Sequence, residues 1–162
     1  MTRLWLFLHL LGFTLWIGGG FGVMVSSIAA RNEDRARLAA VVRAHSAVYR
    51  LVIGPAAIVT VVAGLVLTLG VGGGGLGGAD LGGAPIGAQA GLNAWLLVMQ
   101  VAGILAAVLT LFVSVPTAAR LARLDAEASA DYFDELRGRQ RVAGAIWGAL
   151  GLLALVAGAI WR

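Results

Sequence analysis

The apolar stretch LHLLGFTLWIGGG, residues 8–20, contains a histidine, His9, with a leucine on each side. Trp5, Phe13 and Trp16 share a helical face with it, because residues three or four apart are neighbours on a helix. An imidazole between flat apolar walls is suited to holding a haem iron, with the ring nitrogen as axial ligand. His9 is therefore a candidate cofactor and metal ligand, and the three aromatic residues are candidate walls of the same site.

Met99 and Gln100, in the third apolar run, are expected at a depth similar to that of His9. At 1.5 Å per residue, His9 lies about 7–8 Å below the outer membrane edge and the other two lie about 10–12 Å below it. Methionine is a known second axial ligand, and Gln100 can hydrogen-bond the other ring nitrogen of a ligating histidine. Arg3 and Arg162 are candidates for holding haem carboxylates. The plainer alternatives are packing for Met99, a helix–helix hydrogen bond for Gln100 and terminal charges for the two arginines.

The composition indicates a membrane protein. Of the 162 residues, 60% are apolar and only 12% are charged, whereas about a quarter of a soluble domain is charged. The chain has no cysteine, which excludes disulfides and thiolate metal sites. All 12 basic residues are arginines that flank apolar runs, so the net charge of +4 indicates membrane orientation and not a nucleic-acid partner.

The apolar runs predict the fold. Each of four runs approaches the ~20 residues needed to cross a bilayer, and we place them at 4–26, 48–69, 92–115 and 142–161. We expect the first to be a retained helix and not a cleaved signal. The prediction is an all-α, polytopic membrane four-helix bundle that forms a single domain over residues 1–162. The one charged residue within these runs is Arg50, at the inner start of the second run, and because none lies deeper, an ion-coupled transporter is disfavoured.

The arginines predict the orientation. Four lie between the first two runs, with Arg50 at the start of the second run, and five lie between the last two, whereas residues 70–91 contain none. Positive segments stay inside, so both termini are expected outside, with 70–91 as a flexible glycine-rich outer loop. Residues 117–141 repeat apolar side chains at helical spacing, which predicts an amphipathic inner-side helix between spans three and four, or a continuation of span three. Residues 32–47 are expected to be helical as well.

Two features of the helices bear on packing. Gly18 and Gly22 form a small-xxx-small pair that allows close helix contact. Pro55 removes one backbone hydrogen bond to the carbonyl near Leu51 and is expected to kink span two, with Gly54 beside it easing the bend. The kink either opens a lateral pocket or serves packing.

His45 lies at the inner side of the second run, roughly 20 Å from the depth of His9 on a ~30 Å core. The two histidines are therefore not expected to ligate one iron. His45 is interpreted either as an interfacial histidine or as part of a group that holds an anion, together with Arg43, Tyr49 and Arg50.

Two segments carry a resemblance to known membrane proteins. LHLLGFTLWIGG, residues 8–19, looks like the first helix of the CopD and HemJ-type proteins. YRLVIGPAAIVTVVAGLVL, residues 49–67, resembles the second helix of the HemJ-type protoporphyrinogen oxidases, with Tyr-Arg, then a proline, then a glycine. AWLLVMQVAG, residues 94–103, falls where that family has its third helix.

The resemblance implies a small four-helix protein of the bacterial inner (cytoplasmic) membrane. It implies haem b bound through His9 and a redox role that resembles protoporphyrinogen oxidation, with a porphyrin or an electron carrier as partner beside the lipid bilayer. Tyr49, Arg50 and Pro55 would belong to the family core. Relatives of the CopD type are linked to copper uptake.

Three hypotheses follow. The first is a haem b protein with His9 as ligand. The second is a copper-handling protein that uses His9 with Met99, because imidazole and thioether suit copper. The third is a cofactor-free membrane assembly subunit in which His9 hydrogen-bonds a neighbouring helix. A homo-oligomer is compatible with each of them.

Overall fold

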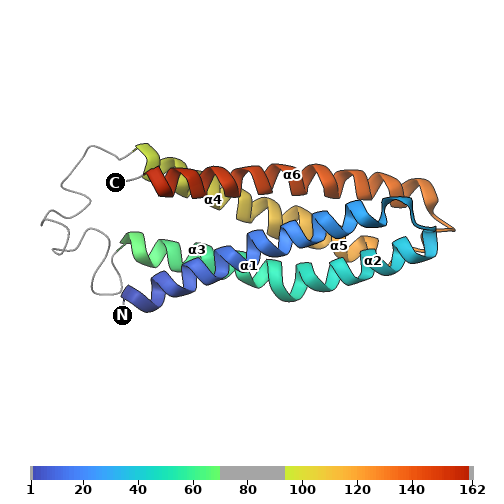
Figure 1. Cartoon of the computed structure of the whole chain (residues 1–162), viewed down its shortest axis with the longest axis horizontal. Helices are drawn as coiled ribbons and strands as arrows, with labels where there is room; N and C mark the ends of the chain where they lie inside the picture. The colour runs from blue at the N-terminus through green and yellow to red at the C-terminus, as the bar shows by residue number, and fades with distance from the viewer. Residues whose placement is uncertain (1, 70–93, 161–162) are drawn as a thin grey trace, which may run out of the picture.

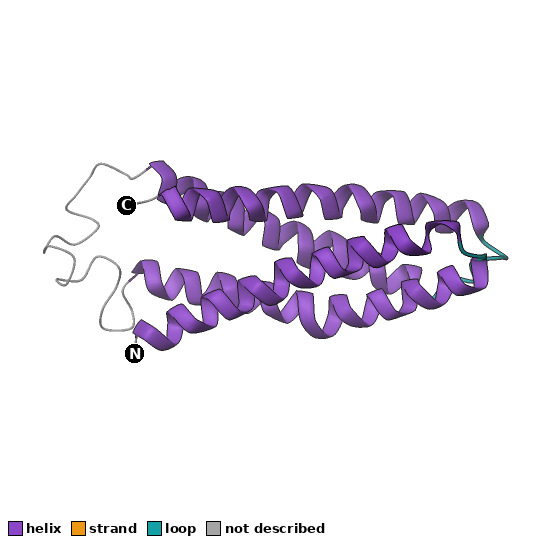
Figure 2. Cartoon of the chain, in the orientation of Figure 1, coloured by secondary structure: helices purple, strands orange, loops and turns teal. Residues whose placement is uncertain are grey.

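A computed structural model describes residues 2–69 and 94–160, and within them the chain contains helices and turns but no strand (Figure 2). The all-α prediction is confirmed. The predicted outer loop 70–91 and Arg162 lie outside the described residues. The elements, labelled in Figure 1 where there is room, are α1 (Thr2–Ala29), η1 (Ala30–Asn32), α2 (Arg35–Val48), η2 (Tyr49–Ile53), α3 (Gly54–Leu69), α4 (Ala94–Leu109), η4 (Thr110–Ser114), α5 (Val115–Leu121) and α6 (Ala130–Ile160).

Within the described residues, four helical stretches are long and apolar enough to cross a membrane, namely Arg3–Asn32, Arg35–Thr68, Trp95–Leu121 and Ala130–Ala159.

 The four stretches contain 30, 34, 27 and 30 residues. At 1.5 Å per residue they measure about 40–50 Å, which exceeds the ~30 Å hydrocarbon core of a bilayer. Each predicted run coincides with the part of its helix that was expected to lie toward the outer side. Each helix then continues further toward the end that carries the turns at 30–34 and 122–129.

The helix ends gather at two opposite ends of the molecule, and these ends differ in charge. In Figure 1 the start of α1, the end of α3, the start of α4 and the end of α6 lie together at one end. The turns at 30–34 and 122–129 lie at the opposite end, and all the arginines of the described residues except Arg3 are in those turns or in the halves of the helices next to them. This arrangement agrees with the arginine count, and the N-out, C-out orientation itself stays a prediction.

The distribution of apolar side chains is that of a membrane bundle. Large apolar residues face outward along the apolar stretches, and Phe112 is 75% exposed and Leu51 71% exposed. The interior is rich in small residues, such as Ala57, Ala106 and Ala157, each of them fully buried. Small side chains let helix backbones approach closely, which favours association where lipid replaces water.

Two helix pairs pack most closely, α1 with α3 and α4 with α6. On α1, a Cβ atom built at Gly12 would lie 2.7 Å from Oγ1 of Thr60 on α3. On α6, a Cβ atom at Gly158 would lie 2.9 Å from Sδ of Met99 on α4. The predicted pair, Gly18 and Gly22, behaves differently, since nothing in the described chain lies within 4 Å of a Cβ atom at either position. Close contact within the bundle therefore depends on other glycines.

Pro55 follows a π-helical turn, and the predicted kink of span two stays a prediction. The five residues of η2 precede Gly54, whose N–H donates to the carbonyl of Tyr49. A second π-helical turn, η4, precedes Pro116 in the same way, with the N–H of Val115 donating to the carbonyl of Thr110. A wider turn removes the clash between a proline ring and the preceding carbonyls. The third span therefore continues past Pro116 to the end of α5.

Gly54, the residue that follows η2, packs against η4 and the residue that follows η4. A Cβ atom at Gly54 would lie 3.6 Å from Cγ2 of Val115 and 3.9 Å from Cδ2 of Leu111. It would also lie 3.1 Å from the Tyr49 carbonyl, so a side chain at this position would crowd both its own helix and its neighbour. The paired distortions place Tyr49 and Ser114 in the interior, where both are buried.

The predicted amphipathic segment 117–141 is not a separate helix. Its first residues end α5, its last residues begin α6, and a turn joins them at 122–129. Within this turn, Asp125 accepts hydrogen bonds from the N–H groups of Glu127 (2.9 Å) and Ala128 (3.2 Å). These bonds lower the pKa of Asp125, so their stabilising effect is present at neutral pH and is lost as the pH falls through that lowered pKa.

The predicted inner helix 32–47 is confirmed as α2, which begins after its N-cap, Asp34. The Asp34 carboxylate accepts a 2.8 Å hydrogen bond from the N–H of Arg37. A second apolar cluster joins α2 to α5 and the start of α6, and at its centre Phe133 is fully buried. The inner ends of the helices are therefore held together beyond the apolar spans.

The contact of α1 with α6 gives a first prediction. A side chain at Gly20 would collide with the Trp147 ring, which is buried and stacked and has no room to move. Gly20→Ala is therefore expected to destabilise the fold by about 1–3 kcal/mol. The measurement is the thermal unfolding midpoint of the purified protein in detergent. Gly22→Ala is the matched control, because its Cβ atom meets nothing within 4 Å, and equal midpoints for the two variants would contradict the assignment.

Candidate functional site

The polar side chains of the bundle form two groups, one at each end. The outer group contains His9, and the inner group contains His45. Between them lies an apolar core built around Trp16 and Trp147, whose rings stack with centroids 6.1 Å apart and planes inclined at 17°. This agrees with the prediction that the two histidines serve different sites.

His9 is half-buried on α1 and lies against α3. Its Nδ1 atom is 2.8 Å from the backbone carbonyl oxygen of Thr60. A carbonyl only accepts, so Nδ1 carries the proton and donates it, and in the neutral ring Nε2 is then the atom with the free lone pair. Gly64 makes room for the ring, because a Cβ atom there would lie 3.1 Å from Cε1 and 3.2 Å from Nδ1 of His9. The imidazole is thus held in one orientation, with Nδ1 as the donor to α3.

The three candidate aromatic walls have different surroundings. Trp5 and Phe13 are half-buried, and Phe13 packs against the central apolar core. Trp16 is almost fully buried and belongs to that core. Its Nε1–H donates to Oγ1 of Thr110 over 3.2 Å, and the same hydroxyl donates to the carbonyl of Ala106. Trp16 therefore links α1 to η4 and α6.

Met99 and Gln100 point to different helices. Nε2 of Gln100 donates to Oγ1 of Thr68 on α3 over 3.1 Å, which is a helix–helix hydrogen bond. Thr68 in turn donates to the carbonyl of Gly64, the residue that packs against the imidazole. Met99 lies against Gly158 of α6 instead. Gln100 is thus connected to the surroundings of His9 through α3, whereas the structure records no contact of Met99 with His9.

The remaining outer candidate, Arg3, is exposed on the first turns of α1. Among the described residues, no group of three or more His, Asp or Glu side chains is arranged to hold a metal ion. Among the described residues of the outer end, His9 supplies the imidazole.

The inner group surrounds a cavity of about 50 Å³. His45 and Tyr49 line it from α2 and η2, and Arg137, Gln140 and Arg141 line it from α6. Nε2 of His45 also lies 2.7 Å from Oγ of Ser26, whose hydroxyl donates to the carbonyl of Gly22. The imidazole N–H therefore donates to the Ser26 oxygen.

His45 and Tyr49 line this cavity, but the arginines that line it are not the two predicted to hold an anion with them. Arg43 and Arg50 are exposed and do not line the cavity, whereas residues of α6 do. The position of Gln140 in the sequence could have indicated a role for it. It continues a buried stripe at three- and four-residue spacing that otherwise consists of apolar side chains, namely Phe133, Leu136, Ala143 and Trp147. A polar residue at such a position indicates a special role.

A few buried polar atoms of the described residues have no hydrogen-bond partner. They are Oγ of Ser114, Nε1 of Trp147, and both Nε2 and Oε1 of Gln140. Two of these residues belong to α6 and the third to η4, which packs on α6. Buried polar atoms are usually satisfied, so the interior along α6 is where an additional small molecule would be stabilised.

Comparison with known proteins supports the class of the molecule. A family model described as a predicted integral membrane protein (DUF2269) matches residues 3–75, which contain α1, α2 and α3. The match includes His9, Thr60 and His45. No curated protein and no solved structure matches the chain. The four apolar helices and the family match together define a multi-pass integral membrane protein.

The tryptophan core gives a second prediction. Thr110→Val removes the acceptor of the buried Trp16 N–H, which is expected to destabilise the fold by about 1–3 kcal/mol. Thr14→Val is the control, because the exposed Thr14 hydroxyl donates only to the carbonyl of Leu10 on its own helix. Thermal unfolding followed by tryptophan fluorescence measures both variants. A Thr110→Val midpoint no lower than that of Thr14→Val would show that the bond is unimportant.

Proposed function

We propose that the protein binds haem b in the bacterial inner membrane and has a redox role, with Nε2 of His9 as the axial ligand. The observation that carries the proposal is the hydrogen bond from Nδ1 of His9 to the Thr60 carbonyl. Metal-ligating histidines commonly donate their other ring N–H in this way, which fixes the tautomer and the ring orientation. The resemblance of residues 8–19 to the first helix of CopD and HemJ-type proteins supports the same assignment.

The residues around His9 fit such a group in part. The imidazole supplies a nitrogen ligand, and Trp5 and Phe13 are half-buried aromatic side chains on the same helix. Gln100 would act through Thr68 and Gly64 by holding α3 in place. Haem would supply one-electron chemistry, which serves either electron transfer or the oxidation of a porphyrinogen. In this proposal His9 is the one ligand from the protein.

A second function is favoured by the same contact. The bond between His9 and Thr60 joins α1 to α3, and this is what a cofactor-free assembly subunit would use the histidine for. Copper handling has less support, since it would require Met99 beside His9 and Met99 lies against α6. The experiments below separate haem binding from a purely structural histidine.

The first experiment is a visible absorption spectrum of the purified protein, oxidised and reduced. The wild type is expected to show a Soret band, and His9→Ala is expected to lose it, because the axial nitrogen is gone. His45→Ala is the matched control and should keep the band, since His45 belongs to the inner cavity. A colourless wild-type preparation from haem-sufficient cells would support the cofactor-free alternative and end the haem proposal.

A second experiment tests the orientation of the ring. In Gly64→Ala the new methyl group would press on Cε1 and Nδ1 of His9 and displace the ring from the Thr60 carbonyl. We expect a several-fold lower haem content and a shifted Soret band, in the range of losses seen when outer-shell partners are changed. Gly103→Ala on α4 is the control, because a Cβ atom there meets nothing within 4 Å. Haem content equal to that of the control would contradict the proposed ligand geometry.

A further inference from the structure

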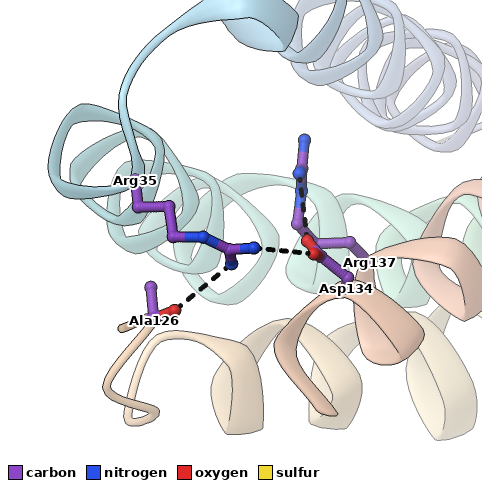
Figure 3. Close-up of polar contacts among 4 residues, drawn as sticks. All are labelled: Arg35, Ala126, Asp134 and Arg137. Carbon is purple, nitrogen blue, oxygen red and sulfur yellow. Dashed lines mark hydrogen bonds and ion pairs between the residues drawn. The ribbon is translucent and has the colours of Figure 1, made fainter. Parts of the chain in front are cut away.

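The inner cavity contains a largely enclosed guanidinium group with little neutralisation. The side chain of Arg137 is only 15% exposed. Its nearest recorded carboxylate is that of Asp134, with Nη1 and Oδ1 3.7 Å apart, which is too long for a hydrogen bond. The other oxygen of Asp134, Oδ2, accepts a 3.3 Å hydrogen bond from Arg35, which also donates to the carbonyl of Ala126 (Figure 3).

The charges around the cavity do not balance. Figure 3 shows Asp134 between Arg35 and Arg137, so one carboxylate serves two guanidinium groups. Arg141 lines the same cavity and adds a further positive charge. No other recorded ion pair involves Arg137 or Arg141 in the part of the chain that the structure describes. Arg141 is exposed, but Arg137 is largely enclosed, and an enclosed charge is normally paired, so this arrangement favours an anion.

Gln140 is an independent observation that points to a ligand. Both polar atoms of its amide are buried and make no full hydrogen bond, although the Tyr49 hydroxyl is a recorded polar neighbour, and its side chain lines the cavity between Arg137 and Arg141. A leucine would continue the buried stripe of α6 at this position, so packing alone does not explain an amide. The NH₂ group can donate to a bound anion, and the carbonyl oxygen can accept from water in the same cavity.

The size of the cavity limits the ligand. One water requires at least about 10–15 Å³ measured in this way, so about 50 Å³ holds several waters or one compact oxyanion. The cavity lies at the arginine-rich end of the bundle, which is predicted to be on the inner side of the membrane. Arginine forks match the oxygens of a phosphate group.

We propose that this cavity binds a phosphate group, held by Arg137 and Arg141 with the amide of Gln140 as an additional donor. His45 and Tyr49 close the opposite wall. The phosphate group belongs either to a free inorganic or small organic phosphate or to the head group of an anionic lipid. The site is separate from His9 and does not depend on the proposed haem binding.

The experiment measures thermal unfolding and calorimetric binding of the full chain in a neutral detergent and a phosphate-free buffer. One arm adds inorganic phosphate and compares it with chloride at equal ionic strength. The other arm adds short-chain phosphatidylglycerol and compares it with phosphatidylcholine. A ligand that binds only the folded state raises the unfolding midpoint, so at least one probe should do so in the wild type. A response to phosphate alone identifies a free phosphate, and a response to phosphatidylglycerol identifies a lipid.

Two variants test the residues. Arg137→Gln is expected to weaken binding by about tenfold or more, the effect of losing one charged hydrogen-bonding partner. Arg139→Gln is its matched control and should bind like the wild type, because Arg139 is exposed on the same helix and does not line the cavity. Gln140→Leu is expected to unfold at a higher temperature than the wild type without ligand, and to show a smaller response to the probe.

The outcome for Gln140→Leu separates binding from a structural role. If Gln140 had a purely structural role, Gln140→Leu would be less stable than the wild type in every buffer. Gln140→Leu also tests the phosphate proposal if Arg137→Gln does not fold. The proposal is overturned if neither probe shifts the wild-type midpoint beyond its control, or if Gln140→Leu and Arg137→Gln both respond as the wild type does. The Soret band is not part of this readout, so the two proposals fail independently.

Discussion

The close approach of α1 to α3 is the constraint on which the outer half of the molecule depends. Gly12 lets Thr60 and the carbonyl of Ala56 come within 3.0 Å of where a Cβ atom would stand, and Gly64 leaves room for the imidazole of His9. In a membrane no water competes for the ring N–H, so a carbonyl of the neighbouring helix takes it. A larger residue at either glycine would separate the helices and release that bond.

The middle of the bundle keeps its two polar ends apart. Trp16 and Trp147 stack there, and small residues fill the remaining space. The π-helical turns before Pro55 and Pro116 make this packing possible, because the widened turns let two proline-containing helices lie against each other at Gly54. The inner end is different in kind, since it combines a second apolar cluster with ten of the arginines, and it encloses the cavity beside Arg137.

Much of the fold was predictable because it follows from the composition of short segments. Apolar runs of about 20 residues predict membrane helices, and Pro55 predicted a distortion of the second. Pro116 was missed as a second distortion because it stood next to the predicted end of span three. The segment 117–141 has the spacing of an amphipathic helix, and the spacing could not show that a turn capped by Asp125 divides it.

The sequence by itself determined the number and order of the membrane helices, the clustering of arginines at one end, and the unusual histidine in the first helix. Only the tertiary structure decided what each polar side chain meets. Met99 and Gln100 are adjacent in the chain, yet one lies against α6 and the other bonds α3. Adjacent residues on a helix point about 100° apart, and which neighbour each one faces depends on how the helix is rotated in the bundle. That rotation is set by contacts between distant glycines and bulky side chains, which no local pattern contains.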